Sequence, residues 1–254
     1  MDCSATASRY RGPLRARAPI ADRAFGICDH AFGAYDSRHI DARRSDMGAS
    51  PQASLRRQHA ALADMVRAVE PDFANELAGH LLAQYGSLTA VLSEPLDGLT
   101  TATGNAMLAA VISSAKSVVV ESLLAELPKA PFSAANQSVV RYVTAILGGL
   151  THEEAHAFFL DGRLGFLRHE VFSYGAEDRA AFPVQMIFRR AVQIGSSQIV
   201  LIHNHPSGSP EPSEMDKDVT SKIAAAGRAI GISIHDHLVV AGPHMFSFRA
   251  AGLL

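Results

Sequence analysis

The chain has few cysteines, little excess charge of either sign and no long uninterrupted apolar run. Its two cysteines, Cys3 and Cys28, lie near the N-terminus, so neither a disulfide framework nor a Cys-x-x-Cys metal knuckle is available. The formal net charge is only -2 over 254 residues, so the composition does not require a nucleic acid as partner. These features favour a reducing, cytoplasmic setting.

Membrane and secretory signals are absent from the pattern as well. The best apolar stretch, 106–127, is interrupted by Lys116 and Glu121, so it predicts a helix of a soluble domain and no membrane association. The first two dozen residues contain five arginines and no apolar core, which excludes a secretory signal and leaves a transit peptide as the minor alternative. Residues 1–50 show no apolar periodicity and are predicted to be a disordered extension or an over-long start.

Two domains are expected after this extension. In residues 51–130 apolar residues recur at helical spacing between short turns, which predicts a small all-α domain. Residues 128–137, "PKAPFSAANQ", indicate a linker. Residues 131–254 then predict an α/β fold, a mixed β-sheet flanked by helices. The expected strands are 155–161, 164–173, 196–203, 231–240 and 244–249, and the expected helices are 183–195 and 213–229.

The stretch 203–216, "HNHPSGSPEPSEMD", carries the chemistry. His203 and His205 lie two residues apart at the end of an apolar strand, so their side chains point to the same side. The Pro/Gly/Ser loop bends the chain back and brings Ser213 to a helix N-cap and Asp216 into the first turn. Such a Ser-x-x-Asp pair is also explained by capping alone. The combination favours zinc held by His203, His205 and Asp216, with a fourth position open, as in catalytic sites.

These residues also carry a family resemblance. The spacing H-x-H-x7-S-x-x-D resembles that of the JAMM (MPN-type) zinc metalloproteases, and 203–216 together with 231–240, "GISIHDHLVV", is similar to the RadC branch. The resemblance implies a JAMM/MPN domain with cytidine-deaminase-like layering over residues 131–254, preceded by a degenerate helix-hairpin-helix-like domain. It further implies a zinc-dependent metallopeptidase that hydrolyses amide or isopeptide bonds of a peptide or protein substrate.

The resemblance implies two further catalytic residues. A glutamate is expected at the start of an early strand, and the register places Glu153 there. Glu154 is the alternative, because a slip of one residue turns a strand side chain to the other face. Glu153 would act as general base and then general acid. Ser213 would donate a hydrogen bond to the oxyanion.

Two other segments admit more than one interpretation. His235 and His237 are expected on one side of their strand and Asp236 on the other. For this second cluster, a role in supporting the first cluster or simple core polarity is favoured over a second metal site. The segment 99–107, "LTTATGNAM", contains Gly104 but not the second glycine of a DNA-binding hairpin. At most a weak association with DNA is therefore expected. The alternative function is a DNA-associated repair or recombination factor whose metal site is structural or vestigial. The oligomeric state is left open.

Overall fold

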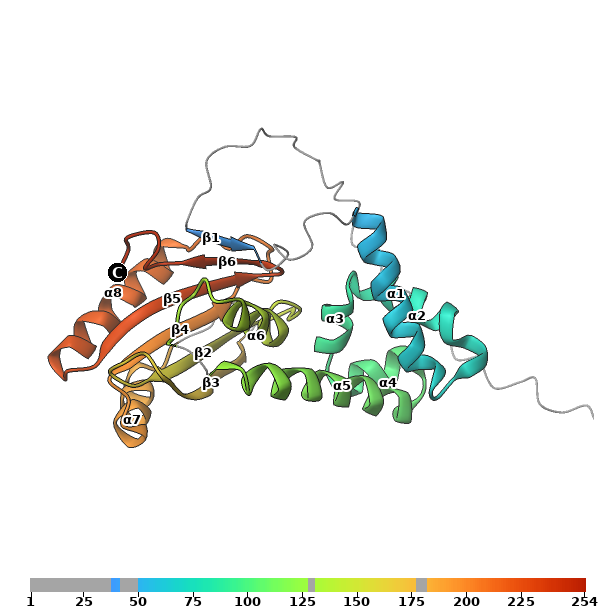
Figure 1. The fold of residues 1–254 in the computed structure, drawn as a ribbon, viewed down its shortest axis with the longest axis horizontal. Helices are drawn as coiled ribbons and strands as arrows, with labels where there is room; N and C mark the ends of the chain where they lie inside the picture. Colours follow the sequence, from blue (N-terminus) through green and yellow to red (C-terminus); the bar gives the residue numbers. More distant parts are fainter. Residues whose placement is uncertain (1–37, 42–49, 128–130, 177–181) are drawn as a thin grey trace, which may run out of the picture. The chain divides into compact units, whose positions relative to one another are not determined.

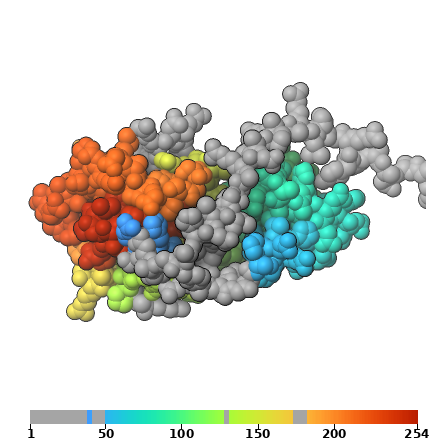
Figure 2. Space-filling view, turned by 90° about the horizontal axis from the view of Figure 1, so that it is seen from above, coloured from blue at the N-terminus to red at the C-terminus, as the bar shows by residue number. Residues whose placement is uncertain are grey.

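The computed structural model describes most of the chain after the predicted extension. The described residues are 38–41, 50–127, 131–176 and 182–254. The extension therefore lies mostly outside them, but its residues 39–41 form a strand, β1 (His39–Asp41), and for this segment the prediction of disorder is wrong. β1 pairs antiparallel with β6 (His244–Ser247), and Ile40 is buried in the apolar core. In Figure 2 β1 appears in blue beside the red C-terminal segment.

A helical unit comes first, as the apolar spacing predicts. Its elements are α1 (Pro51–Arg67), the short 3-10 helix η2 (Pro71–Phe73), α2 (Ala74–Tyr85), α3 (Leu88–Ser93), α4 (Leu96–Thr103) and α5 (Ala106–Leu124). Ser50, Ser87 and Asn105 cap α1, α3 and α5 by accepting backbone N–H groups with their side chains. Leu62 and Leu99 are among the fully buried residues of this unit's own core.

The α/β part confirms the predicted mixed sheet. Its helices are α6 (Gln137–Leu147), α7 (Val184–Ile194) and α8 (Glu214–Ala229), and its further strands are β2 (Glu153–Leu160), β3 (Phe166–Ala176), β4 (Gln198–Asn204) and β5 (Ser233–Ala241). The described strands form one sheet in the order β1-β6-β5-β4-β2-β3 (Figure 1). Only β4 and β5 are parallel. In the strand order β4 lies between β5 and β2 and is a central strand. Because β4 and β5 are parallel, α8 and its loop form the crossover between them.

Helices cover both faces of this sheet. On one face α6 packs on the alternate residues Phe158, Val200 and Leu238. On the other face α7 and α8 pack on the intervening residues, including Ala157 and Leu201. Because side chains alternate along a strand, neighbouring residues at the end of β4 and at the start of β2 face different layers.

Helix α6 and the shape of β5 were not predicted. The sequence predicts a linker up to residue 137 and no element from there to residue 147, yet Asn136 caps α6 and one side of this helix is buried against the sheet. In β5 a register shift against β4 falls between Ile234 and Asp236. His235 consequently contacts Phe132, in the layer of α6, whereas His237 contacts Phe182, which packs in the layer of α7 and α8. The expectation that His235 and His237 share a side is therefore wrong.

Helix α5 is the most apolar helix of the described residues. By length and composition alone it could cross a membrane: an 18-residue window of it has a mean hydropathy of 1.6, and 17% of that window is buried. Its Leu108 and Ile112 belong to the helical core, and its Leu123 and Leu124 pack against the core beneath α6. Both ends of α5 are thus packed against apolar cores of the described chain.

Candidate metal centre

His203 and His205 are held at the end of β4 by the neighbouring strands. His203 pairs with Ala155 of β2 and Val239 of β5. The backbone N–H of His205 donates to the carbonyl of Val240 at 2.7 Å, so the strand geometry continues through this residue. The loop then turns at Gly208, whose φ of 86° lies in the left-handed region that favours glycine.

The loop returns at Ser213, which caps α8 as predicted. Its hydroxyl oxygen accepts the N–H of Asp216, and the Asp216 carboxylate accepts the N–H of Ser213 at 2.7 Å, which completes a capping box. The hydroxyl of Ser213 also donates to Oδ2 of Asp216 at 2.6 Å. In this arrangement Ser213 positions the carboxylate, and its predicted role at an oxyanion stays a prediction.

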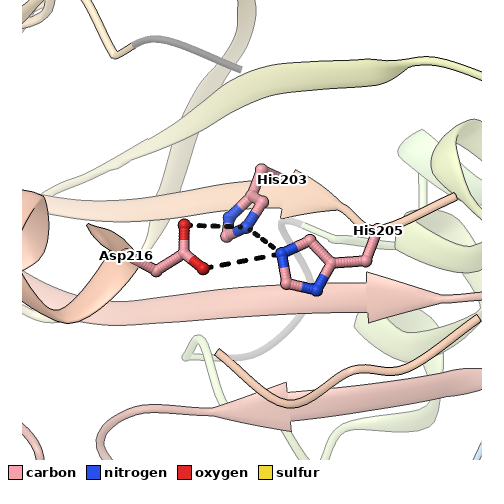
Figure 3. Close-up of side chains that lie close together, drawn as sticks. All are labelled: His203, His205 and Asp216. Atoms are coloured by element: carbon pink, nitrogen blue, oxygen red, sulfur yellow. Dashed lines mark hydrogen bonds and ion pairs between the residues drawn. The ribbon is translucent and has the colours of Figure 1, made fainter. Parts of the chain in front are cut away.

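The structure brings His203, His205 and Asp216 together (Figure 3). Nε2 of His203 lies 3.0 Å from Nε2 of His205 and 3.3 Å from Oδ1 of Asp216, and Nε2 of His205 lies 3.5 Å from Oδ2. Ligands at about 2.0–2.1 Å around a tetrahedral zinc are separated by about 3.3 Å. Within the described ranges these are the residues whose ligand atoms meet within 4.8 Å as a potential metal-binding group of three.

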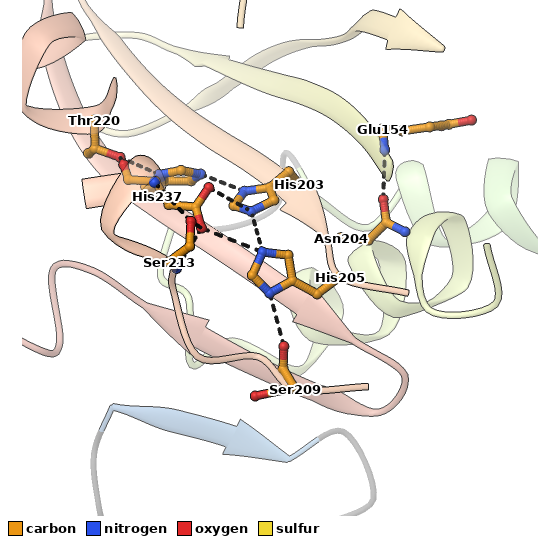
Figure 4. Close-up of polar contacts among 9 residues, drawn as sticks. Glu154, His203, Asn204, His205, Ser209, Ser213, Thr220 and His237 are labelled. Carbon is orange, nitrogen blue, oxygen red and sulfur yellow. Dashed lines mark hydrogen bonds and ion pairs between the residues drawn. The ribbon is translucent and has the colours of Figure 1, made fainter. Parts of the chain in front are cut away.

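Hydrogen bonds on the far side of each ring leave both Nε2 atoms for the site (Figure 4). Nδ1 of His205 lies 3.0 Å from the carbonyl oxygen of Ser209, which can only accept, so Nδ1 carries the hydrogen. Thr220 donates to the carbonyl of Asp216 and accepts from Nδ1 of His237. Nε2 of His237 must then accept from Nδ1 of His203, at 2.8 Å.

This pattern tests whether the residues fit a cation. Two neutral rings would face each other with Nε2 lone pairs 3.0 Å apart beside a carboxylate, which is repulsive unless a proton or a metal ion lies between them. The donor set of two imidazoles and one carboxylate suits zinc. The residues therefore fit the metal that the sequence predicts.

The pKa values agree with this interpretation. Burial lowers the pKa of His203 to about 4, against the opposing charge of Asp216. The hydrogen bond with Asp216 raises the pKa of His205, against the effect of burial. Burial also raises the pKa of Asp216, but hydrogen bonds from His205 and Ser213 and the charge of His203 outweigh it and hold that pKa well below its usual range. The site thus contains a neutral imidazole and a carboxylate, the forms that bind metals.

Glu153 and Glu154 differ in their relation to the histidine site. Glu153 is at the start of β2, and its charge helps to raise the pKa of His205. Glu154 instead points away from the histidines in Figure 4, and its carboxylate bonds to His152 and His156, each at 2.9 Å. Of the two candidates, Glu153 is therefore the one whose charge acts on the site.

Sequence reasoning did not predict that Thr220 joins the site, and for His237 it left support of the site and core polarity as alternatives. Both are buried, and Phe248 stacks on the ring of His237 with centroids 4.6 Å apart. The available signal was the pair His235 and His237, for which support of the first cluster was one expectation. His237 fulfils it and His235 does not. Thr220 offered no sequence signal, because its role depends on α8 lying against β5.

Comparison with known proteins places this site in context. The model of the family described as RadC-like JAB domain matches residues 133–253. A UPF0758 protein of Rhodobacter capsulatus is 32% identical over 195 residues, which cover 75% of this chain and 89% of that protein. UPF0758 proteins of Leptothrix cholodnii and Thermotoga maritima are 32% and 29% identical over 184 and 180 residues, in each case 70% of this chain and 81% of the relative. These alignments are longer than the matched domain, so the similarity extends beyond it.

Proposed function

This chain belongs to the RadC family, and we propose that it is a zinc-dependent metallopeptidase that hydrolyses amide or isopeptide bonds. The observation that carries the proposal is the convergence of the Nε2 atoms of His203 and His205 on the carboxylate of Asp216. The relation of the JAB domain to the JAMM hydrolases supports the same reaction class. The substrate class is a peptide or protein, and the setting we propose is the cytoplasm.

Each residue of the site has its own role in the proposed reaction. Bound zinc would lower the pKa of a water toward about 7 and polarise the scissile carbonyl. Glu153 would accept the proton of that water and deliver it to the leaving amine. Ser213 would hold Asp216 and, after rotation of its hydroxyl, could donate to the developing oxyanion. His237 and Thr220 would keep His203 in the tautomer with a free Nε2.

Metal analysis tests the binding half of this proposal. We expect the full-length protein to hold about one zinc per chain and His203→Ala to lose it. His235→Ala is the matched control, since it removes a histidine that lies in the other layer of the sheet. If the wild type held no stoichiometric zinc and His203→Ala had the same metal content, the proposal would be overturned.

Turnover tests the catalytic half. With peptide and isopeptide substrates, Glu153→Gln should retain zinc and lose about 10²–10⁴-fold in kcat. Glu154→Gln should cost far less, because a glutamine can still bond to His152 and His156. A loss confined to Glu154→Gln would reverse the assignment of the base.

A role in DNA repair or recombination is the second candidate function, and it has less support. Gly104 (φ 64°) ends α4, and the side chain of Asn105 accepts the N–H groups of Met107 and Leu108. The amide of Asn105 also donates to the carboxylate of Glu70 at 2.6 Å. The hairpin N–H groups that would meet a phosphate are thus already bonded, beside a carboxylate. Salt-dependent retention of the full-length protein on duplex DNA would favour this candidate, and no retention at low salt would count against it.

A further inference from the structure

The backbone ladder between β2 and β4 stops where the metal centre begins. Its last pair is Ala155 and His203. One residue further, Asn204 replaces the ladder with its side chain: Oδ1 accepts the N–H of Glu154 and Nδ2 donates to the carbonyl of His152, both at 2.8 Å. Only 2% of Asn204 is exposed. Its carboxamide thus joins the two strands on the face away from the metal centre (Figure 4).

The position of this bridge in the chain connects it to the chemistry. Asn204 lies between His203 and His205, and the backbone that it holds lies next to Glu153. On its other edge β2 pairs with β3 through a register shift between Glu153 and Glu154. Because the β2–β3 ladder is irregular at this point, it fixes the backbone beside Glu153 less firmly than the two hydrogen bonds of Asn204 do. The bridge therefore sets the distance between the strand that carries the base and the strand that carries the ligands.

A partly buried series of hydrogen bonds holds Glu154 on the same far face. Its carboxylate accepts from Nε2 of His156, whose Nδ1 lies 2.8 Å from Nε2 of His169, and Nδ1 of His169 lies 2.8 Å from the hydroxyl of Tyr142 in α6. Each group has a donor and an acceptor in its neutral form when Tyr142 donates to His169 and His169 donates to His156. This series opposes the one-residue slip that would exchange Glu153 for Glu154.

We infer that Asn204 is a positioning residue: its carboxamide joins β2 to β4 so that Glu153, and not Glu154, faces His203 and His205. The inference rests on the proposed function in one respect, since Glu153 matters there as the catalytic base. The contacts of Asn204 are independent of that assumption.

The test uses cobalt(II) as a spectroscopic probe in the full-length protein. Asn204→Ala removes the bridge, and Asn136→Ala is the matched control, because the Oδ1 of Asn136 also accepts a backbone N–H, that of Ser138, at the start of α6. We expect Asn204→Ala to bind cobalt but to change its visible absorption band in the same direction as Glu153→Gln. The double variant should show no further change, because Asn204 acts through Glu153. Asn136→Ala should keep the wild-type band.

Amide hydrogen exchange supplies a second measurement, and its first part uses the wild type alone. In the wild type the N–H of Glu154 should be protected, and in Asn204→Ala it should exchange at least about fivefold faster. A fully exposed rate in the wild type would overturn the inference, as would a wild-type cobalt band in Asn204→Ala.

Failure of the proposed function is seen separately. It would appear in the wild type as absent zinc or absent hydrolysis, while the protection of the Glu154 amide would be unaffected. If hydrolysis is found, Asn204→Ala should lower kcat much more than it raises KM, because it displaces the base and leaves the metal ligands in place.

Discussion

His203 donates a hydrogen bond from Nδ1 to Nε2 of His237 at 2.8 Å, and this contact decides which nitrogen of His203 faces the metal centre. The acceptor character of His237 in turn depends on Thr220, whose hydroxyl is committed to the carbonyl of Asp216. One hydroxyl in α8 thus determines the tautomers of two buried rings. Burial keeps both rings neutral, since it lowers the pKa of each below the ordinary histidine value.

Thr220→Val should therefore weaken zinc binding without removing a ligand. The valine leaves Nδ1–H of His237 without an acceptor in a buried place, which favours the other tautomer and deprives His203 of its support. We expect zinc affinity to fall about 10–100-fold, measured by competition with a chelating dye. Thr103→Val is the control, because Thr103 is equally buried and also bonds the carbonyl four residues earlier. Equal zinc affinities for the two variants would contradict the tautomer assignment.

Zinc binding in acid should displace one proton from the two histidines. The pKa of His205 is raised by Asp216, so below that raised pKa the metal-free ring carries a proton that zinc must displace. His203 has a pKa of about 4 and releases none at higher pH. Calorimetry in buffers of different ionisation enthalpy should give about one proton at pH 6, where the metal-free His205 ring is charged. Affinity should decline as the pH falls through the pKa of His205. Release of two protons at pH 6 would show that both rings are charged.

The convergence of His203, His205 and Asp216 could be predicted from sequence because its geometry is local. Strand alternation puts His203 and His205 on one side, and a capping box puts Asp216 in the first turn of α8. All of this is specified within residues 203–216. The sheet was predictable for the same reason, since apolar runs and turn residues mark most of its strands.

What escaped prediction depends on contacts between distant segments. β1 consists of three residues and exists only because β6 pairs with it. The layer that His235 faces follows from a register shift between β4 and β5, which neither strand displays alone. Asn204 reads in sequence as the residue between two histidines, and its bridge to His152 appears only when β2 lies beside β4.

Ser213→Ala should affect both stability and metal binding. Loss of the N-cap should lower the free energy of unfolding by about 1 kcal/mol, measured by denaturant titration. Loss of the hydroxyl that donates to Asp216 should also weaken zinc binding. Ser50→Ala, which removes the cap of α1, is the control and should lower stability by a similar amount with unchanged zinc affinity. Unchanged zinc affinity in Ser213→Ala would show that capping is the whole role of this residue.

Ile40→Ala tests whether the segment ahead of the helical unit belongs to the folded sheet. Ile40 is 9% exposed and packs in the cluster that contains Val240 and Met245, so its truncation should lower the free energy of unfolding by about 2 kcal/mol. Ile230→Ala is the control, since Ile230 is 55% exposed and its truncation should change stability by less than about 0.5 kcal/mol. Denaturant titration of the metal-free protein measures both. Equal stability of the two variants would show that Ile40 is not part of the core, since truncating a core isoleucine leaves a destabilising cavity. The sheet would then end at β6.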